Sequence, residues 1–521
     1  MTRKLISLAS LSLLFGCPSD DPSQGNDESS TGSADTSGSP TSSPTTTPTT
    51  TTLETTDPDT SVGTDPDTGS TTSNADTAAM RVVHAAPGAP NVDVYVEGSD
   101  TPVITDLPYA QASEYLEVPA GSYNFQVRAA GAPAGDPPAY ETGALELPAD
   151  AVITAVAAGV LGSDDEADAF RVLPLAEGFA DPGAGNAAVR LVHAGADAPS
   201  VDVNVGNDGG APELPGVARF ADSGPEGVAL PSGTALQVGI ESGGEVVTAF
   251  TTPELPEGAQ LFVVATGLLA ALPRESTGFG LLAVGPDGVI GLIQQNPIVY
   301  ALHASPDAGE VDICVADTPL VVGAEYFDLA RVQVPPGSYD LEFHAAPSDC
   351  TGEPVSTQPS GELAAGQQYL AIATGEVSPE AGDDNQAFQL AAYVEQFDLD
   401  AAPEATFRII HSAVAPTVDV GTLDGNGQLT DDTLLVTDLS WPDESDAITV
   451  PAGDYEVGVI GANAMLPDPP LAAYLAPLGE GTRAWAIAVG DLQSNGGEPG
   501  FSVWALLTDT QPWTLVELPE A

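Results

Sequence analysis

Arg81-Val-Val-His84-Ala-Ala-Pro87, followed by Val92-Asp93-Val94, is the stretch that decides the fold, because it recurs three more times along the 521 residues of the chain. The histidine of this stretch returns at positions 193, 303 and 411, so each copy lies 108 to 110 residues after the previous one. Three further landmarks keep the same order in every copy: a Pro-x-Gly step, an apolar run that ends in glycine, and a later phenylalanine. Self-similarity at a fixed period indicates tandem copies of one structural unit.

The segments between these landmarks have the pattern of short β-strands. Residues 92–96 and 123–127 alternate apolar with other side chains, and a period of two is typical of a strand with one buried face. Pro and Gly turns separate such segments about every 8 to 12 residues, as in β-sandwich proteins. We therefore predict an all-β protein of four tandem antiparallel β-sandwich domains, immunoglobulin-like or transthyretin-like. Their predicted ranges are residues 79–182, 187–294, 297–400 and 404–521.

Residues 1–16 have the order of a bacterial signal peptide. A positively charged start precedes an apolar run over residues 5–15, which is too short to span a bilayer. The ending Leu-Phe-Gly-Cys17 resembles the lipobox of bacterial lipoproteins, although the bulky Phe15 departs from the usual small residue. This resemblance implies a lipid on Cys17, membrane attachment through it, and a place in the cell envelope outside the cytoplasm, which we expect to be the outer membrane. The alternative is an ordinary secretory signal followed by an unmodified cysteine.

Residues 17–78 follow as a predicted disordered linker. Ser, Thr, Pro and Asp dominate it, and no Lys, Arg or aromatic residue occurs between Pro18 and Thr77. Such a composition cannot bury a core, so we expect a flexible tether between the membrane and the repeats.

The charge of the chain restricts its partners. It has 75 Asp and Glu against 11 Lys and Arg, a formal net charge of -64 at pH 7. Because like charges repel the phosphates of nucleic acid, we exclude nucleic-acid partners. A solvated acidic surface accounts for this charge without a bound metal.

The cysteine count agrees with export. If one of the three cysteines, Cys17, carries a lipid, Cys314 and Cys350 remain as a pair in an oxidising compartment. We predict a disulfide between them, the alternative being two free buried thiols.

Four of the five histidines occupy one repeat position, and an aspartate between aliphatic residues follows each of them. We expect structural roles, with each imidazole buried and bonded to a nearby carboxylate, such as one on the neighbouring strand, or to a backbone group, because buried polar groups need partners. Zinc sites use three or four protein ligands, and nucleophilic catalysis needs a Ser or Cys near the histidine, which this repeat does not supply. The sequence therefore predicts no catalytic residue, no metal and no cofactor. The repeated residues are His84, Asp93, His193, Asp202, His303, Asp312, His411 and Asp419.

Arginine precedes the histidine by three positions in three of the four copies. Arg81, Arg190 and Arg408 hold this position, and Tyr300 replaces arginine in the third copy. In so acidic a chain we interpret the arginine as a structural ion-pair partner.

The motifs His-Ala-x-Pro-x-Ala, Val-Asp-Val and Val-Pro-x-Gly-x-Tyr together resemble the bacterial domain of unknown function 4397. The resemblance covers nearly everything after Met80 and implies tandem β-sandwich modules on an exported protein, with no implied activity. The second copy departs at Ala235, where the tyrosine is missing, and the fourth at Ala413-Val414, where the His-to-Asp segment is shorter.

Anchor, tether and repeats together predict a class of function. We expect a cell-surface lipoprotein that presents tandem β-sandwich modules for adhesion, matrix binding or envelope interaction with a surface or extracellular macromolecule, and not an enzyme. The alternative is a cell-envelope enzyme with a site in one repeat, which should show convergent polar residues in that repeat alone.

Overall fold

The computed structural model describes residues 76–133, 135–379, 386–399, 403–492 and 499–521. The expected signal peptide, Cys17 and nearly all of the expected linker lie outside these residues. No α-helix occurs among the described residues, and none of them forms a helix long and apolar enough to cross a bilayer. The expected all-β class is confirmed.

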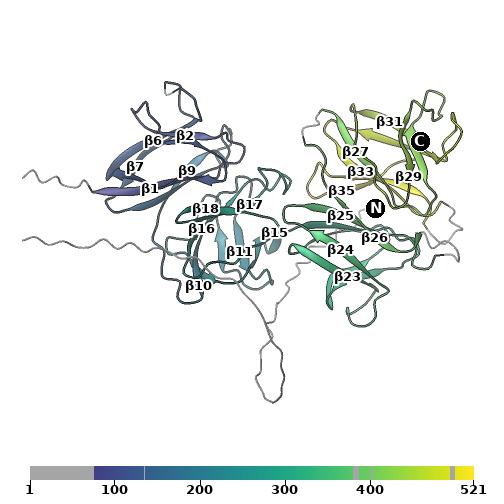
Figure 1. Cartoon of the computed structure of the whole chain (residues 1–521), viewed down its shortest axis with the longest axis horizontal. Coiled ribbons are helices and arrows are strands. Elements are labelled where there is room, and N and C mark those ends of the chain that lie inside the picture. The colour runs from purple at the N-terminus through teal and green to yellow at the C-terminus, as the bar shows by residue number, and fades with distance from the viewer. Residues whose placement is uncertain (1–75, 134, 380–385, 400–402, 493–498) are drawn as a thin grey trace, which may run out of the picture. The chain divides into compact units, whose positions relative to one another are not determined.

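The first repeat is a sandwich of two sheets (Figure 1). One sheet has the order β4-β1-β8-β9, with β5 also paired to β1, and the other has the order β3-β2-β6-β7. The first strand begins two residues before the expected start of this repeat. The strands are β1 (Thr77–His84), β2 (Val92–Val96), β3 (Ile104–Leu107), β4 (Gln111–Ala112), β5 (Leu116–Pro119), β6 (Gly121–Ala129), β7 (Tyr140–Leu147), β8 (Val152–Ala158) and β9 (Arg171–Ala176).

The second repeat has the same plan, with sheets β13-β10-β16-β17-β18 and β12-β11-β14-β15. An additional strand, β18, extends the first of these sheets. The strands are β10 (Asn186–His193), β11 (Val201–Val205), β12 (Leu214–Val217), β13 (Val228–Pro231), β14 (Gln237–Ser242), β15 (Glu245–Thr251), β16 (Gln260–Thr266), β17 (Gly280–Gly285) and β18 (Gly288–Gln294).

The third repeat has the sheets β22-β19-β25-β26 and β21-β20-β23-β24. Its strands are β19 (Ile298–His303), β20 (Val311–Val315), β21 (Thr318–Ala324), β22 (Leu329–Gln333), β23 (Gly337–Ala345), β24 (Ser356–Leu363), β25 (Gln368–Thr374) and β26 (Gln389–Val394).

The fourth repeat has the sheets β30-β27-β33-β34-β35 and β29-β28-β31-β32, with β35 as an additional strand like β18. Its strands are β27 (Ala405–His411), β28 (Val418–Thr422), β29 (Leu434–Leu439), β30 (Ile448–Val450), β31 (Gly453–Gly461), β32 (Ala472–Leu478), β33 (Arg483–Val489), β34 (Ser502–Leu507) and β35 (Thr514–Glu517).

One strand pair in each repeat departs from the antiparallel expectation. In every repeat the first strand lies parallel to a later strand of the same sheet, which the chain reaches only after it has formed the second sheet. The parallel pairs are β1 with β8, β10 with β16, β19 with β25, and β27 with β33. A parallel pair needs a long crossover between its strands. Here the whole second sheet forms that crossover, which is why local sequence pattern does not reveal the parallel pair.

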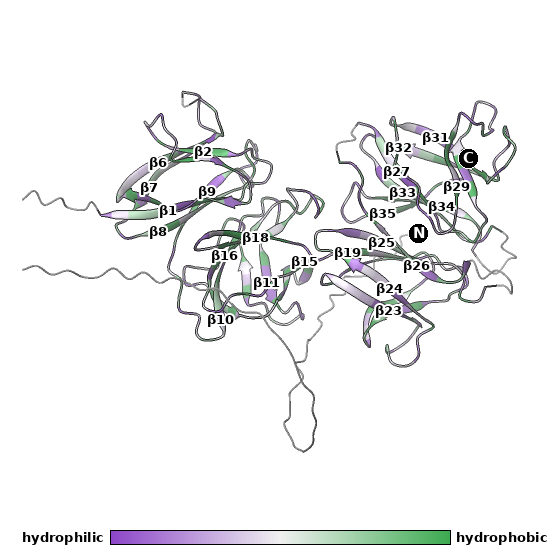
Figure 2. Cartoon of the chain, viewed as in Figure 1, coloured by the Kyte–Doolittle hydropathy of each residue, from purple (hydrophilic) through white to green (hydrophobic). Residues whose placement is uncertain are grey.

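Alternation along the strands builds the core of each sandwich. In the first repeat Met80, Val82, Val94 and Phe125 point between the sheets and are at most 7% exposed. Figure 2 shows hydrophobic residues alternating with hydrophilic ones along many of the strands, as a period of two requires.

The Pro-x-Gly-x-Tyr segments form one recurring corner. Tyr123 donates its hydroxyl to the carbonyl of Pro119 at 2.7 Å, and the equivalent tyrosines of the third and fourth repeats bond to Pro335 and Pro451. In the second repeat the pairing of Val203 with Ile240 places Leu236 at this position, one residue after Ala235. In the first, third and fourth repeats the tyrosine hydroxyl thus holds the Pro-x-Gly turn that precedes its strand. The second repeat lacks this hydrogen bond, because leucine replaces the tyrosine.

The first and second repeats pack against each other through the outer faces of their β1-β8-β9 and β10-β16-β17 sheets. Two arginines make reciprocal contacts across this interface. Arg81 donates to the carbonyl of Gly285 at 2.6 Å, and Arg190 donates to the carbonyl of Ala176 at 2.7 Å. The strand register places Arg81 and Arg190 at the same position of their repeats. It also places the two acceptors, Ala176 and Gly285, at one shared position, so the interface has an approximate two-fold relation.

The third and fourth repeats are joined by aromatic rings. All four tryptophans of the chain lie in the fourth repeat, and each contacts the third repeat. Trp513 stacks on Tyr300 with ring centres 4.1 Å apart, and its backbone N–H donates to the tyrosine hydroxyl. Of the other three, Trp441 contacts Thr374, Trp485 contacts Phe397 and Trp504 contacts Phe327.

The second and third repeats are also in direct contact. The buried amide of Gln333 accepts from the backbone N–H of Ala249 at 3.0 Å and donates to the carbonyl of Asn296 at 2.9 Å. Buried polar groups with complete partners hold one arrangement in preference to others. Successive repeats are therefore connected by specific contacts and not by a bare linker.

Candidate functional site

The four repeated histidines lie at the ends of β1, β10, β19 and β27, under the loop that leads to the next strand. Each is at most 4% exposed. Each ring places Nε2 within hydrogen-bond distance of a backbone carbonyl five or six residues later, and a neutral imidazole protonated at Nε2 donates this bond. The acceptors are Pro90 (3.1 Å), Pro199 (2.7 Å), Gly309 (3.0 Å) and Pro416 (3.0 Å).

Burial determines the charge state of these histidines. It lowers the pKa of His84, His193, His303 and His411 below the ordinary value of 6.5, because a charged ring loses hydration there. The hydrogen bond to the carbonyl opposes this effect in each case but is the smaller cause. All four rings are therefore neutral at pH 7.

The repeated aspartates bind backbone N–H groups instead of the histidines. Asp93 accepts from Asp106 at 2.8 Å and from Gly131 at 2.9 Å, and Asp312 accepts from Gly323 at 2.7 Å and from Ser348 at 2.6 Å. Asp202 and Asp419 each accept from the corresponding residue of the next strand, Gly216 and Asp438.

The N–H donor on the next strand has a positive φ in all four repeats, between 50° and 65°. The register of the strand pair shifts at the same place. A bulge of this kind leaves a backbone donor without a ladder partner, and the carboxylate supplies one. The repeated aspartate therefore stabilises a β-bulge.

Of the two partners expected for each histidine, a carboxylate or a backbone group, the structure shows the backbone group. Val92 and Val94 point into the core, so Asp93 between them faces the opposite side of its strand. His84 lies at the end of the other sheet and bonds to its own loop. The period of two thus separates the two side chains, and each takes a backbone partner.

No group of three His, Cys, Asp or Glu side chains that could hold a metal ion occurs in the described part of the chain. The predicted disulfide is confirmed: Cys314 is bonded to Cys350, with their Cα atoms 5.8 Å apart and both residues buried. It links β20 to the loop after β23.

The repeated arginines form the expected ion pairs. Arg81 lies 3.6 Å from Glu177, Arg190 lies 2.8 Å from Asp222, and the third pair is Arg408 with Glu444 at 3.0 Å. Sequence reasoning missed a fourth pair, between Arg274 and Glu395 at 2.6 Å, because Arg274 stands outside the repeat position. The sequence does carry a signal for the acid of this pair, because Glu395 occupies in the third repeat the position that Glu177 occupies in the first.

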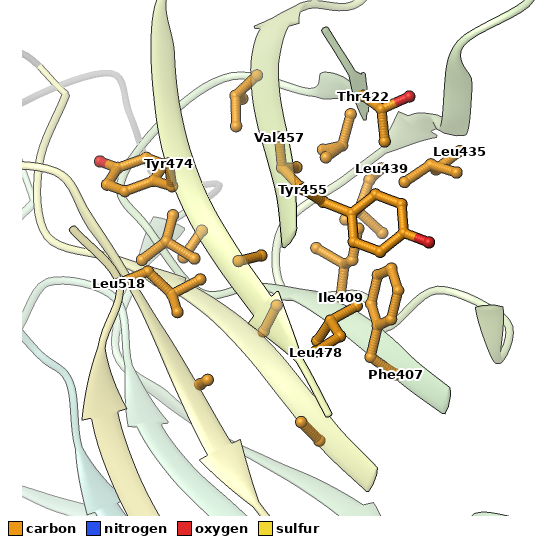
Figure 3. Close-up of a pocket in the computed structure, with 18 of the residues that line it drawn as sticks. Phe407, Ile409, Thr422, Leu435, Leu439, Tyr455, Val457, Tyr474, Leu478 and Leu518 are labelled. Carbon is orange, nitrogen blue, oxygen red and sulfur yellow. The ribbon is translucent and has the colours of Figure 1, made fainter. Parts of the chain in front are cut away.

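The interiors of several sandwiches are incompletely filled. The fourth repeat contains an apolar cavity of about 100 Å³ between its two sheets (Figure 3). Phe407 and Ile409 line it from one sheet, and Tyr455, Val457 and Tyr474 from the other. The second and third repeats have cavities of about 160 and 50 Å³ in the corresponding place.

Two regions of the chain match a known family model. Residues 78–204 and 298–421 match the family model described as Domain of unknown function (DUF4397). Each match begins in the first strand of an odd-numbered repeat and ends within the second strand of the next repeat. No curated protein matches the sequence.

One solved structure that resembles the chain is the Bacillus anthracis TIE protein. It is 11% identical, with a TM-score of 0.13. The similarity covers 79% of this chain and 66% of that one, so the chain spans just under two thirds of that protein.

Proposed function

Because the chain carries tandem regions of the domain of unknown function 4397, at residues 78–204 and 298–421, we propose that it is a structural or binding array held outside a bacterial cell. The observation that carries this proposal is the set of specific contacts between successive repeats. Arg81 and Arg190 join the first two, Gln333 joins the second to the third, and the tryptophans join the third to the fourth. An array of this kind presents several similar surfaces on one chain.

The repeated polar residues support a structural reading of the body. Each repeated histidine bonds to a loop carbonyl, each aspartate to a bulge, and each repeated arginine to a neighbouring acid. Their recurrence is explained by folding alone. The proposed function therefore depends on the surfaces of the repeats and not on chemistry at these residues.

The proposal includes a lipid anchor on Cys17 and a location in the cell envelope, the outer membrane being the expected one. Support comes from the order of residues 1–17 and from the Ser/Thr-rich tether that follows. The partner is then a surface or extracellular macromolecule, and repulsion by the charge of -64 excludes nucleic acid.

The full chain with its own signal, expressed in a Gram-negative host, tests this proposal. We expect the wild type in the outer-membrane fraction and Cys17→Ser in the soluble envelope fraction, because a single lipid modification is then lost. Cys314→Ser/Cys350→Ser is the matched control, since it removes two cysteines and should leave the chain in the membrane. Wild-type protein in the cytoplasm, or Cys17→Ser still in the membrane pellet, contradicts the proposal.

A further inference from the structure

The cavity of the fourth repeat has an identifiable cause in the sequence. Strand register places Val457 where the first repeat has Phe125, and Ala484 where it has Ile153. Both first-repeat residues are buried in the core of their sandwich, at 3% and 5% exposure. A third pair of equivalent positions, Leu145 and Ala476, changes in the same direction. The fourth repeat therefore keeps the frame of the sandwich but lacks three of the side chains that fill it.

The neighbours of these small residues have not closed the gap. Phe407 and Tyr455 lie at one end of the cavity, Tyr474 and Leu518 at the other, and aliphatic side chains form the walls between them (Figure 3). Packing defects of this size are unfavourable, because the lining atoms lose their dispersion contacts. A filled cavity would recover those contacts.

Two polar atoms at the edge of the cavity have partners, whereas Nδ1 of His411 is buried without one among the described residues. The hydroxyl of Tyr455 donates to the carbonyl of Pro451 at 2.7 Å, and Nε2 of His411 bonds to the carbonyl of Pro416 at 3.0 Å. The lining therefore offers hydrocarbon surface to an occupant, and a charged or strongly polar molecule would lose its hydration without compensation.

We propose that the interior of the fourth repeat binds a small uncharged hydrocarbon of about the size of a single six-membered ring. An apolar cavity of roughly 150 Å³ stays dry and takes up benzene. The cavity of the fourth repeat, about 100 Å³, is smaller but has the same apolar kind of lining. Packed sheets stand about 10 Å apart, which favours a flat ring lying between them. This site is independent of the anchor and of the proposed array function.

Benzene is the probe, and tryptophan emission of the full chain is the readout. All four tryptophans lie in the fourth repeat and contact the third, so their emission follows the unfolding of these two repeats and not of the second repeat, which has a cavity of its own. We expect benzene-saturated buffer to raise the midpoint of the thermal emission change by a few degrees, because a ligand that binds only the folded state stabilises it.

Variants that introduce the first-repeat side chains into the fourth repeat test whether benzene binds in this cavity. Val457→Phe and Ala484→Ile should each remove most of the benzene-induced shift, because they fill the cavity with the side chains of Phe125 and Ile153. Val516→Phe is the matched control, since Val516 is 43% exposed on β35 and does not line the cavity. It should keep the full shift.

Xenon provides a second measurement that needs no variant. In a crystal of the wild-type chain under xenon pressure, we expect a xenon atom between Val457 and Ala484. The absence of a benzene shift in the wild type, an equal shift in both filled variants, or a crystal with no xenon between these residues overturns the proposal.

Discussion

Arg274 of the second repeat places its guanidinium on the carboxylate of Glu395 in the third repeat, with Nε 2.6 Å from Oε2 and Nη2 3.1 Å from Oε1. The side chain of Glu395 is fully buried. In the first repeat the equivalent Glu177 is paired with Arg81 of the same repeat, but the third repeat has Tyr300 at that position. The second repeat thus supplies the cation that the third repeat lacks.

Removing this cation should destabilise the third repeat strongly. We expect Arg274→Ala to cost about 3 to 5 kcal/mol, because it leaves a buried carboxylate without a counter-charge. Differential scanning calorimetry of the full chain should show a transition at lower temperature. The double variant Arg274→Ala/Glu395→Gln is the control, and it should recover much of the loss because no buried charge remains. Equal destabilisation in the single and double variants would contradict this account.

The aspartate at the bulge allows a test with a nearly isosteric change. Asp312→Asn should lower stability by about 1 to 3 kcal/mol, since the amide NH2 would face one of the two N–H donors, from Gly323 and Ser348, that the carboxylate accepts. Urea unfolding measures the effect. Asp340→Asn, at an exposed position on β23, is the matched control and should change stability little. An unchanged urea midpoint for Asp312→Asn would rule out this role.

The buried histidines should make stability depend on pH in one direction. The pKa of His84 is lowered in the folded chain, so the unfolded chain binds the proton first as the pH falls. The contribution is complete above pH 6.5 and is lost as the pH falls from there through the folded-state pKa. His84→Gln keeps an N–H donor for the Pro90 carbonyl but does not titrate. The melting temperature of the wild type, relative to this variant, should therefore fall between pH 7.5 and pH 5.5, and a constant difference would exclude the effect.

The disulfide should stabilise the third repeat by restricting its unfolded state. It closes a segment with a sequence separation of 36 residues, for which the chain-entropy model gives about 4 kcal/mol. We expect Cys314→Ser/Cys350→Ser to unfold at lower denaturant concentration, with the loss confined to one transition. Mass spectrometry of the exported protein should find no free thiol at either residue in the wild type. Two free thiols, or an unchanged denaturation midpoint, would speak against the bond.

The sequence predicts the parts of this fold that repeat locally. Alternation at residues such as 123–127, the Pro-x-Gly-x-Tyr corner and the spacing of the histidines all reflect contacts within one repeat, and they predict its all-β sandwich class correctly. The parallel pairing of β1 with β8 was not predictable in this way, because it joins strands that are separated by the whole second sheet. The alternation of apolar residues indicates which face of a strand is buried, but it does not indicate which strand lies beside it.

The same limit explains the outcome at the candidate site residues. Burial of His84 and Asp93 follows from their apolar neighbours, but the partners are backbone groups, which have no residue-specific signal. The contacts between repeats were also hidden, because Arg274, Glu395 and Gln333 each act across a repeat boundary. Three-dimensional proximity across such boundaries is visible only in the structure.

The internal use of arginine also bears on how the body meets proteases. After Lys4 the chain has no lysine, and its nine arginines within the described residues are all buried or half-buried. Trypsin-like enzymes cut after Lys or Arg and need several residues of extended, accessible chain. The strands that contain seven of these arginines do not provide it, whereas Arg219 and Arg274 lie in turns. The same arginines that hold the repeats together thereby leave such enzymes almost no place to cut on the folded body. We therefore expect trypsin to digest the folded body slowly.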